Sequence, residues 1–187
     1  GDLAVGGDWT TASNWTTDAD GDMDLNNPSL IVPTGVPVVI LSGSRINAAS
    51  NGRRSYRATI DGLLNNGSTT GHNLGILQGT GTFRSSTNTF PAGNYTAFVS
   101  AAGGTIEYEF AGSVSMNNRS TYNNLSIRSG TAIMTDNDIT LNGSLSVASG
   151  TTLSNFYNRN ITISGNWTST GGTFVSGSGS VAFVGGG

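Results

Sequence analysis

Two consecutive segments near the end of the chain, residues 139–154 and 161–176, repeat one pattern. They read ITLNGSLSVASGTTLS and ITISGNWTSTGGTFVS and superpose without a gap when Ile139 is aligned with Ile161. The aligned positions are identical at Ile139/Ile161, Thr140/Thr162, Gly143/Gly165, Gly150/Gly172, Thr151/Thr173 and Ser154/Ser176, and similar at Leu141/Ile163, Leu145/Trp167 and Leu153/Val175. Such a repeat, with apolar residues alternating with Thr and Ser, is typical of a β-solenoid in which each repeat forms one coil. We therefore predict an all-β parallel β-helix of the common right-handed kind.

The composition supports a fold made of strands. Of 187 residues, 28 are Gly and only 10% are charged, and the apolar pattern is too regular for a disordered chain. Cysteine is absent, which excludes disulfides and thiolate metal sites. All eight basic residues are Arg and the net charge is −3, so we expect no nucleic-acid partner. No apolar run approaches the length of a membrane span.

We divide the chain into an N-terminal cap with an acidic loop, residues 1–35, and a stack of coils, residues 36–187. Alternation and turn residues predict strands at 36–41, 55–60, 74–86 (two short strands broken at Gly79), 95–101 and 105–110. The sequence ends in VAFVGGG, just after a strand-like run, and we expect the coils to continue beyond it.

A short pattern recurs at Asn124, Asp138 and Asn160. Each of these residues is followed by an apolar residue, a Thr or Ser, and a second apolar residue, and we predict that each opens a coil. The interval from Asn124 to Asp138 is shorter than the interval from Asp138 to Asn160, which implies that coil length varies in the turns. Asn and Asp at equivalent corners can hydrogen-bond from coil to coil, and they tolerate the left-handed backbone that a corner needs.

Four acidic residues in the N-terminal loop form the one candidate metal site. Asp18, Asp20, Asp22 and Asp24 alternate with other residues, a spacing that places oxygen ligands for Ca²⁺ on one side of a tight loop. The EF-hand pattern is incomplete, because its sixth position is Met23 rather than Gly. Two interpretations therefore remain: a calcium site, calcium being the only cofactor we predict, or a solvated acidic turn.

Each of the other candidate functional residues also has an interpretation without a function in binding or catalysis. Trp9 and Trp15 would offer a platform for sugar rings, but we favour a role in capping the open end of the core. His72 is the only histidine, and we expect it to be a loop residue. Glu107 and Glu109 share one face of a strand, about 7 Å apart. A pair of acids can hydrolyse glycosides, but we favour a solvent-exposed pair without catalytic function.

Several segments together resemble a known family. They are the W-x5-W opening followed by PTGVPVVILSG, then GHNLGILQGTGTFRSS, FPAGNY, GGTIEYEF, YNNLSI, DITLNGSLSVASGTTL and NITISGNWTSTGGTFV. The chain resembles the repetitive β-solenoid surface proteins of Bacteroidetes that are exported by the type IX secretion system, including adhesins of gliding motility. The resemblance implies an extracellular, cell-surface location. The partners it implies are neighbouring domains of one large protein, the secretion machinery and surface glycans. Its motifs are structural, so it implies no ligand.

Three hypotheses about function follow. The first is a non-enzymatic structural or adhesive segment, a stiff stalk that presents Thr, Ser and Asn faces. The second is a polysaccharide lyase or glycan-binding module on a β-helix, although the chain has no Lys and its acids cluster only in the N-terminal loop. The third is a subunit that stacks end to end into filaments. We favour the first, and we do not expect an enzyme.

Overall fold

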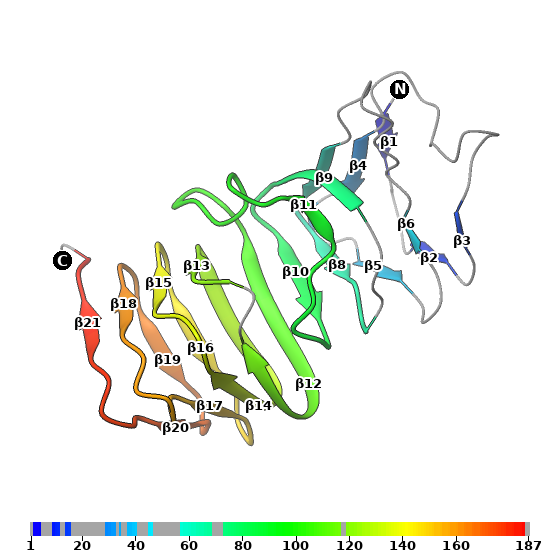
Figure 1. Cartoon of the computed structure of the whole chain (residues 1–187). Helices are drawn as coiled ribbons and strands as arrows, with labels where there is room; N and C mark the ends of the chain where they lie inside the picture. The colour runs from blue at the N-terminus through cyan, green and yellow to red at the C-terminus, as the bar shows by residue number, and fades with distance from the viewer. Residues whose placement is uncertain are drawn as a thin grey trace.

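Strands and turns make up all of the chain that the computed structural model describes, and no helix occurs there. The described residues are 57–68, 73–116 and 119–185, preceded by residue 34 and six short strands between residues 2 and 46. Every strand pairing among them is parallel. The strands stack from the blue N-terminal end to the red C-terminal end (Figure 1). The predicted β-solenoid is thus confirmed.

The strands form three sheets and one separate pair along the stack. The first sheet contains β1 (Asp2–Ala4), β4 (Ser29–Val32), β7 (Arg57–Ile60), β9 (Asn73–Gln78) and β11 (Ala92–Asn94). The long sheet contains β2 (Trp9–Thr11), β5 (Pro37–Ile40), β8 (Leu63–Asn65), β10 (Thr82–Ser85), β12 (Thr105–Met116), β14 (Asn124–Met134), β16 (Leu145–Val147) and β19 (Trp167–Ser169). The third sheet contains β13 (Thr121–Tyr122), β15 (Ile139–Leu141), β18 (Ile161–Ile163) and β21 (Val181–Phe183). The pair is β3 (Asn14–Trp15) with β6 (Arg45–Ile46).

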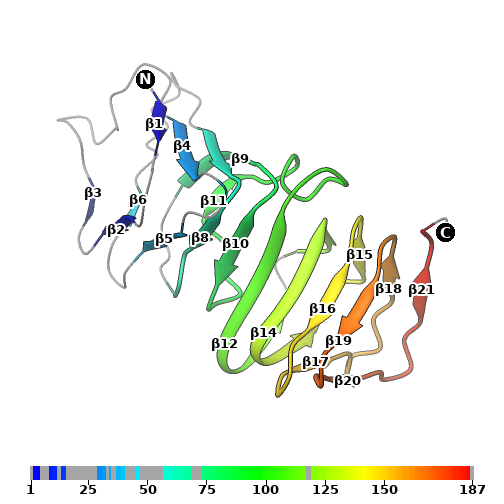
Figure 2. The ribbon, with the colours of Figure 1, turned by 180° about the vertical axis from the view of Figure 1, so that it is seen from behind.

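Two further strands continue the long sheet around a corner. The second half of β14 pairs with β17 (Thr152–Ser154), which pairs with β20 (Thr173–Val175). Figure 2 shows β12, β14, β16 and β19 side by side from behind, with β17 and β20 at their lower ends. The pairing of β12 with β14 shifts register between Glu109 and Ser113, where the two strands turn this corner. The prediction of a strand at 105–110 was therefore too short at its C-terminal end.

The repeat seen in the sequence sets most of the register. Ile139 lies beside Ile161, and Leu145 lies beside Trp167, as the alignment of the two segments requires. At the third strand the prediction is wrong, because Leu153 pairs with Phe174 and not with Val175. The turn before β17 spans residues 148–151, whereas the turn before β20 spans only 170–172. A one-residue slip reverses the faces of a strand, and Val175 accordingly points outward, 42% exposed.

The short interval between Asn124 and Asp138 is not a coil. Asn124 begins β14 in the long sheet and lies beside Thr105, while Asp138 precedes β15 in the third sheet. The true neighbour of Thr140 in the preceding coil is Thr121. The triplets look alike because alternation recurs in every sheet, so the pattern alone does not tell one sheet from another.

Residues 95–101 form turns rather than the predicted strand. The amide of Val99 donates to the carbonyl of Tyr95, and the side chain of Asn94 accepts from the amide of Thr96. Tyr95, Phe98 and Val99 are buried, a spacing of three and four residues that suits a helical turn better than a strand. This segment folds its apolar side chains onto the core within one coil.

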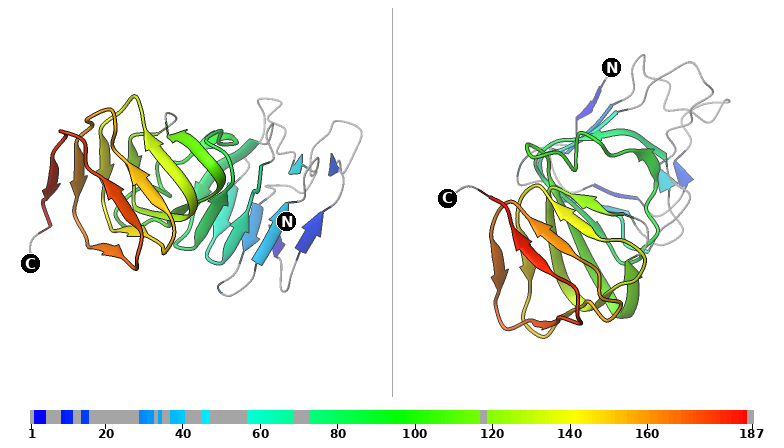
Figure 3. Two further views of the ribbon diagram at one scale, coloured as in Figure 1. Left: turned by 90° about the horizontal axis from the view of Figure 1, so that it is seen from below. Right: turned by 60° about the vertical axis from the view of Figure 1, so that its left-hand side comes forward.

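One apolar core runs along the inside of the stack. Its best-aligned column joins inward residues of consecutive long-sheet strands: Leu64, Phe83, Ile106, Leu125, Leu145 and Trp167. The first five are at most 1% exposed, and Trp167 packs against the cluster from its edge. Burial of one such side chain stabilises the fold by about 1.5–3 kcal/mol, and each coil buries its face only against its neighbours. Figure 3 shows the strands of successive coils stacked side by side.

Candidate functional site

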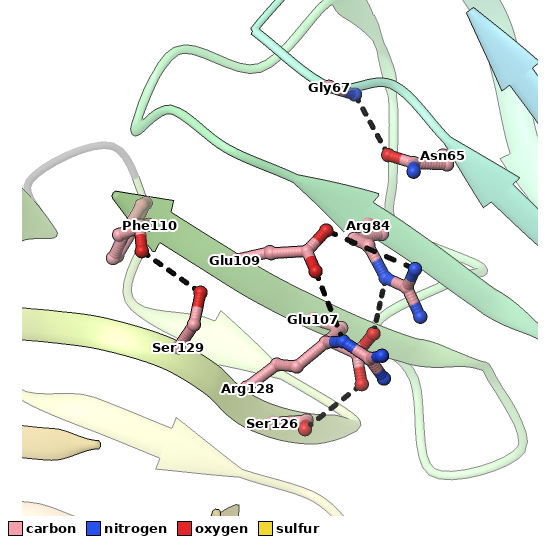
Figure 4. Close-up of polar contacts among 9 residues, drawn as sticks. All are labelled: Asn65, Gly67, Arg84, Glu107, Glu109, Phe110, Ser126, Arg128 and Ser129. Carbon is pink, nitrogen blue, oxygen red and sulfur yellow. Dashed lines mark hydrogen bonds and ion pairs between the residues drawn. The ribbon is translucent and has the colours of Figure 1, made fainter. Parts of the chain in front are cut away.

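The densest group of charged side chains lies on the outer face of the long sheet. Arg84 of β10, Glu107 and Glu109 of β12, and Arg128 of β14 form a ladder across three consecutive strands (Figure 4). Arg84 Nε donates to Glu107 Oε1 at 2.6 Å, and Arg128 Nε donates to Glu109 Oε1 at 3.2 Å. The two glutamates share one face, as predicted, and Tyr108 between them points into the core.

Both carboxylates of this ladder form ion pairs with arginine side chains. Glu107 also accepts a hydrogen bond from the Ser126 hydroxyl, and Arg84 reaches Glu109 at 3.9 Å. A pair of acids that cleaves glycosides needs one carboxyl to act as the acid and one as base or nucleophile. Here each carboxylate instead balances a guanidinium of a neighbouring coil. The arrangement supports cross-coil pairing rather than proton transfer.

The predicted calcium ligands, Asp18, Asp20, Asp22 and Asp24, lie outside the described residues, as does His72. Of Trp9 and Trp15, only the backbone in β2 and β3 is described. Within the described ranges, no group of three or more His, Cys, Asp or Glu side chains is arranged to hold a metal ion. That part of the chain also contains no helix long and apolar enough to cross a membrane.

Polar side chains at the coil corners form ladders along the stack, as predicted. The carboxylate of Asp138 accepts from the backbone and side-chain amides of Asn160, at 2.8 and 3.1 Å. Asn160 Oδ1 then accepts from the amide and hydroxyl of Ser180 in the following coil. The Asn160 backbone amide, followed by its side-chain amide, lowers the pKa of Asp138. The ladder therefore satisfies backbone donors at the corners where the sheets end.

A cluster of phenols and one arginine fills the core near β12. The hydroxyls of Tyr108 and Tyr122 lie 3.3 Å apart, and the guanidinium of Arg119 stacks 4.3 Å from the ring centroid of Tyr95. Burial raises the pKa of Tyr122 to about 12 and raises those of Tyr108 and Tyr95 well above the usual value of 10. These phenols stay neutral at ordinary pH. They pack and hydrogen-bond, and none is poised to act as a base.

Two aromatic side chains point to solvent at a corner that the sequence analysis missed. Phe156 and Tyr157, in the turn between β17 and β18, are 69% and 51% exposed. Their rings contact each other edge to face, with centroids 5.4 Å apart. A signal was present in the segment NFYNRN, because two adjacent aromatic residues interrupt the alternation that places one residue inside and the next outside.

The chain matches no protein-family model, no curated protein and no solved structure.

Proposed function

We propose that this chain is a non-enzymatic, extracellular structural and adhesive segment of a bacterial cell-surface protein. The observation that carries the proposal is the unbroken column of buried apolar side chains along the stack. The outer faces carry hydroxyls, amides and arginines paired with glutamates. Hydrogen bonds between coils run along the axis and make such a stack stiff. A stiff stalk holds contact surfaces away from the cell, and many copies gain avidity from weak contacts.

The resemblance to surface proteins of Bacteroidetes supports export by the type IX secretion system, with neighbouring domains and the secretion machinery as partners. Calcium at Asp18, Asp20, Asp22 and Asp24 remains part of the proposal as a stabilising cofactor. Its test is thermal unfolding in calcium and in EDTA, for the natural chain and an Asp20→Ala/Asp22→Ala variant. A calcium-dependent rise in melting temperature that the variant loses would support the site, whereas equal melting curves would contradict it.

Adhesion of beads coated with the chain tests the proposal. Coated beads should bind to polysaccharide-coated surfaces under flow more often than beads coated with an unrelated β-protein. The soluble chain should leave the same polysaccharides intact, without the unsaturated products of a lyase. Absence of adhesion on every surface would contradict the adhesive function. Release of unsaturated sugars would favour the lyase alternative, and light scattering that grows with concentration would favour the filament alternative.

A further inference from the structure

The aromatic corner, residues 155–160 between β17 and β18, is built more elaborately than its neighbours in the stack. The chain makes the equivalent turn with residues 135–138 one coil earlier and with residues 176–180 one coil later. Those turns read TDND and SGSGS and contain no aromatic residue. Reversal of the chain at this place therefore does not require Phe156 or Tyr157.

Hydrogen bonds hold the aromatic corner in one conformation. Asn155 is fully buried, and its side chain donates to the Arg159 carbonyl at 2.6 Å and accepts from the Arg159 amide at 2.7 Å. Asn158 adopts a left-handed backbone, φ 60°, and its Oδ1 accepts from the Ser178 amide of the next coil. A turn fixed in this way loses little conformational entropy when a ligand binds to it.

The polar groups near the two exposed rings carry little net charge. Asn158 and Asn160 are exposed in the same corner, and the side-chain amide nitrogen of Asn158 has no partner in the described part of the chain. The charged residues of this corner and of the equivalent turns beside it are Asp136, Asp138 and Arg159. Asn160 already contacts the carboxylate of Asp138, and Arg159 Nε donates to a backbone carbonyl. The corner thus combines aromatic faces with amides and lacks an excess of positive charge for an acidic ligand.

From this arrangement we propose that the aromatic corner binds the sugar rings of a neutral polysaccharide. The apolar face of a hexose ring covers an aromatic face, and its hydroxyls hydrogen-bond to amides beside it. The patch contains two rings, which suits one or two sugar units, whereas a stable protein interface buries about 800 Å² on each partner. The proposal rests on the adhesive function proposed above and names the contact and ligand class that would carry it.

Affinity electrophoresis in gels that contain soluble β-glucan, mannan, galactan or xylan tests the proposal. At least one of these neutral polysaccharides should retard the natural chain. The Phe156→Ala/Tyr157→Ala variant should bind about tenfold more weakly or worse, because both ring faces are lost. Phe183→Ala is the matched control, since Phe183 is 61% exposed but lies in β21, outside the corner and in the following coil. The control should keep its affinity within about twofold.

Circular dichroism and melting temperature should be unchanged in the double variant, because both side chains it removes face solvent. No retardation by any of the four polysaccharides, or equal retardation of the natural chain and the double variant, would overturn the proposal. Loss of binding to a protein-coated surface, without any polysaccharide binding, would assign the corner to a protein partner instead. Bead adhesion that the double variant retains would leave the adhesive function standing and refute this site alone.

Discussion

Arg84 Nε in β10 donates a hydrogen bond to Glu107 Oε1 in β12 across 2.6 Å, and both side chains are only 15% exposed. The pair joins two successive coils on the outer face of the long sheet. Because it is largely shielded from water, this pair should stabilise the stack more than the exposed pair of Glu109 with Arg128.

Glu107→Gln should lower the free energy of unfolding by about 1 kcal/mol, because it leaves the Arg84 guanidinium with only the more distant carboxylate of Glu109, 3.9 Å away. Urea unfolding measures the change. Glu109→Gln is the control, since Glu109 and Arg128 are 36% and 50% exposed, and it should change stability by less than about 0.5 kcal/mol. Equal losses of stability in the two variants would show that shielding from water does not strengthen the pair of Arg84 with Glu107.

Gly130→Ala and Gly150→Ala should separate the effect of backbone conformation from that of close packing. The two glycines have φ of 74° and 73°. A Cβ at Gly130 would lie 2.6 Å from the carbonyl oxygens of Gly112 and Phe110, whereas nothing lies within 4 Å at Gly150. We expect Gly150→Ala to lower the free energy of unfolding by about 1–2 kcal/mol through backbone strain. Gly130→Ala should lower it by about 1–3 kcal/mol more, because its Cβ would also overpack against the neighbouring strand. Equal losses in thermal unfolding would contradict the close approach of β14 to β12.

Stability should fall above pH 10 because of the buried phenols. Tyr122 has a pKa of about 12 in the folded chain, against 10 for an exposed phenol. The unfolded chain therefore loses this proton first, and the stability contributed by the neutral phenol is complete below pH 10 and is lost as pH rises toward 12. Tyr108 acts in the same direction. Melting temperatures between pH 8 and 12 measure this loss. Tyr122→Phe should make the fall of melting temperature with pH shallower. An unchanged slope would contradict the assignment of this fall to Tyr122.

Phe174→Ser and Val175→Ser should test the register of β20. Phe174 points inward beside Leu153 and stacks edge to face on Trp167, whereas Val175 points outward. We expect Phe174→Ser to destabilise the chain by about 2–4 kcal/mol and Val175→Ser by less than about 1 kcal/mol. The gapless alignment of the two repeats, which places Val175 beside Leu153, would require the reverse order.

The sequence was sufficient for the parallel stack but not for every turn within it. The alternation of apolar and polar residues set the register where the connecting turns have equal length, as for residues 142–144 and 164–166, which lead to the pairing of Leu145 with Trp167. It failed at Leu153, because a turn one residue longer shifts the pairing while leaving the repeat recognisable. It also failed at residues 95–101, where local hydrogen bonds of Asn94 and Tyr95 favour turns over a strand.

The candidate site was predictable only in part, for the same reason. Glu107 and Glu109 are next-but-one neighbours in one strand, so their common face followed from the period of a strand. Their partners Arg84 and Arg128 lie 23 and 19 residues away, and only the actual coil lengths bring them alongside. The exposure of Phe156 and Tyr157 depends on the buried amide of Asn155, whose role is visible only in three dimensions.

Engineered disulfides test the central claim, that residues about one coil apart lie side by side in a parallel stack. The chain has no cysteine, and Ser126, Ser146 and Thr168 lie in one outward row on β14, β16 and β19. Neighbouring strands are about 4.8 Å apart, within reach of a disulfide, whereas strands two apart are about 10 Å from each other and out of reach. Mild oxidation should crosslink Ser126→Cys/Ser146→Cys within one molecule and leave Ser126→Cys/Thr168→Cys reduced. Crosslinking of the second pair alone, or of neither pair, would contradict the stack.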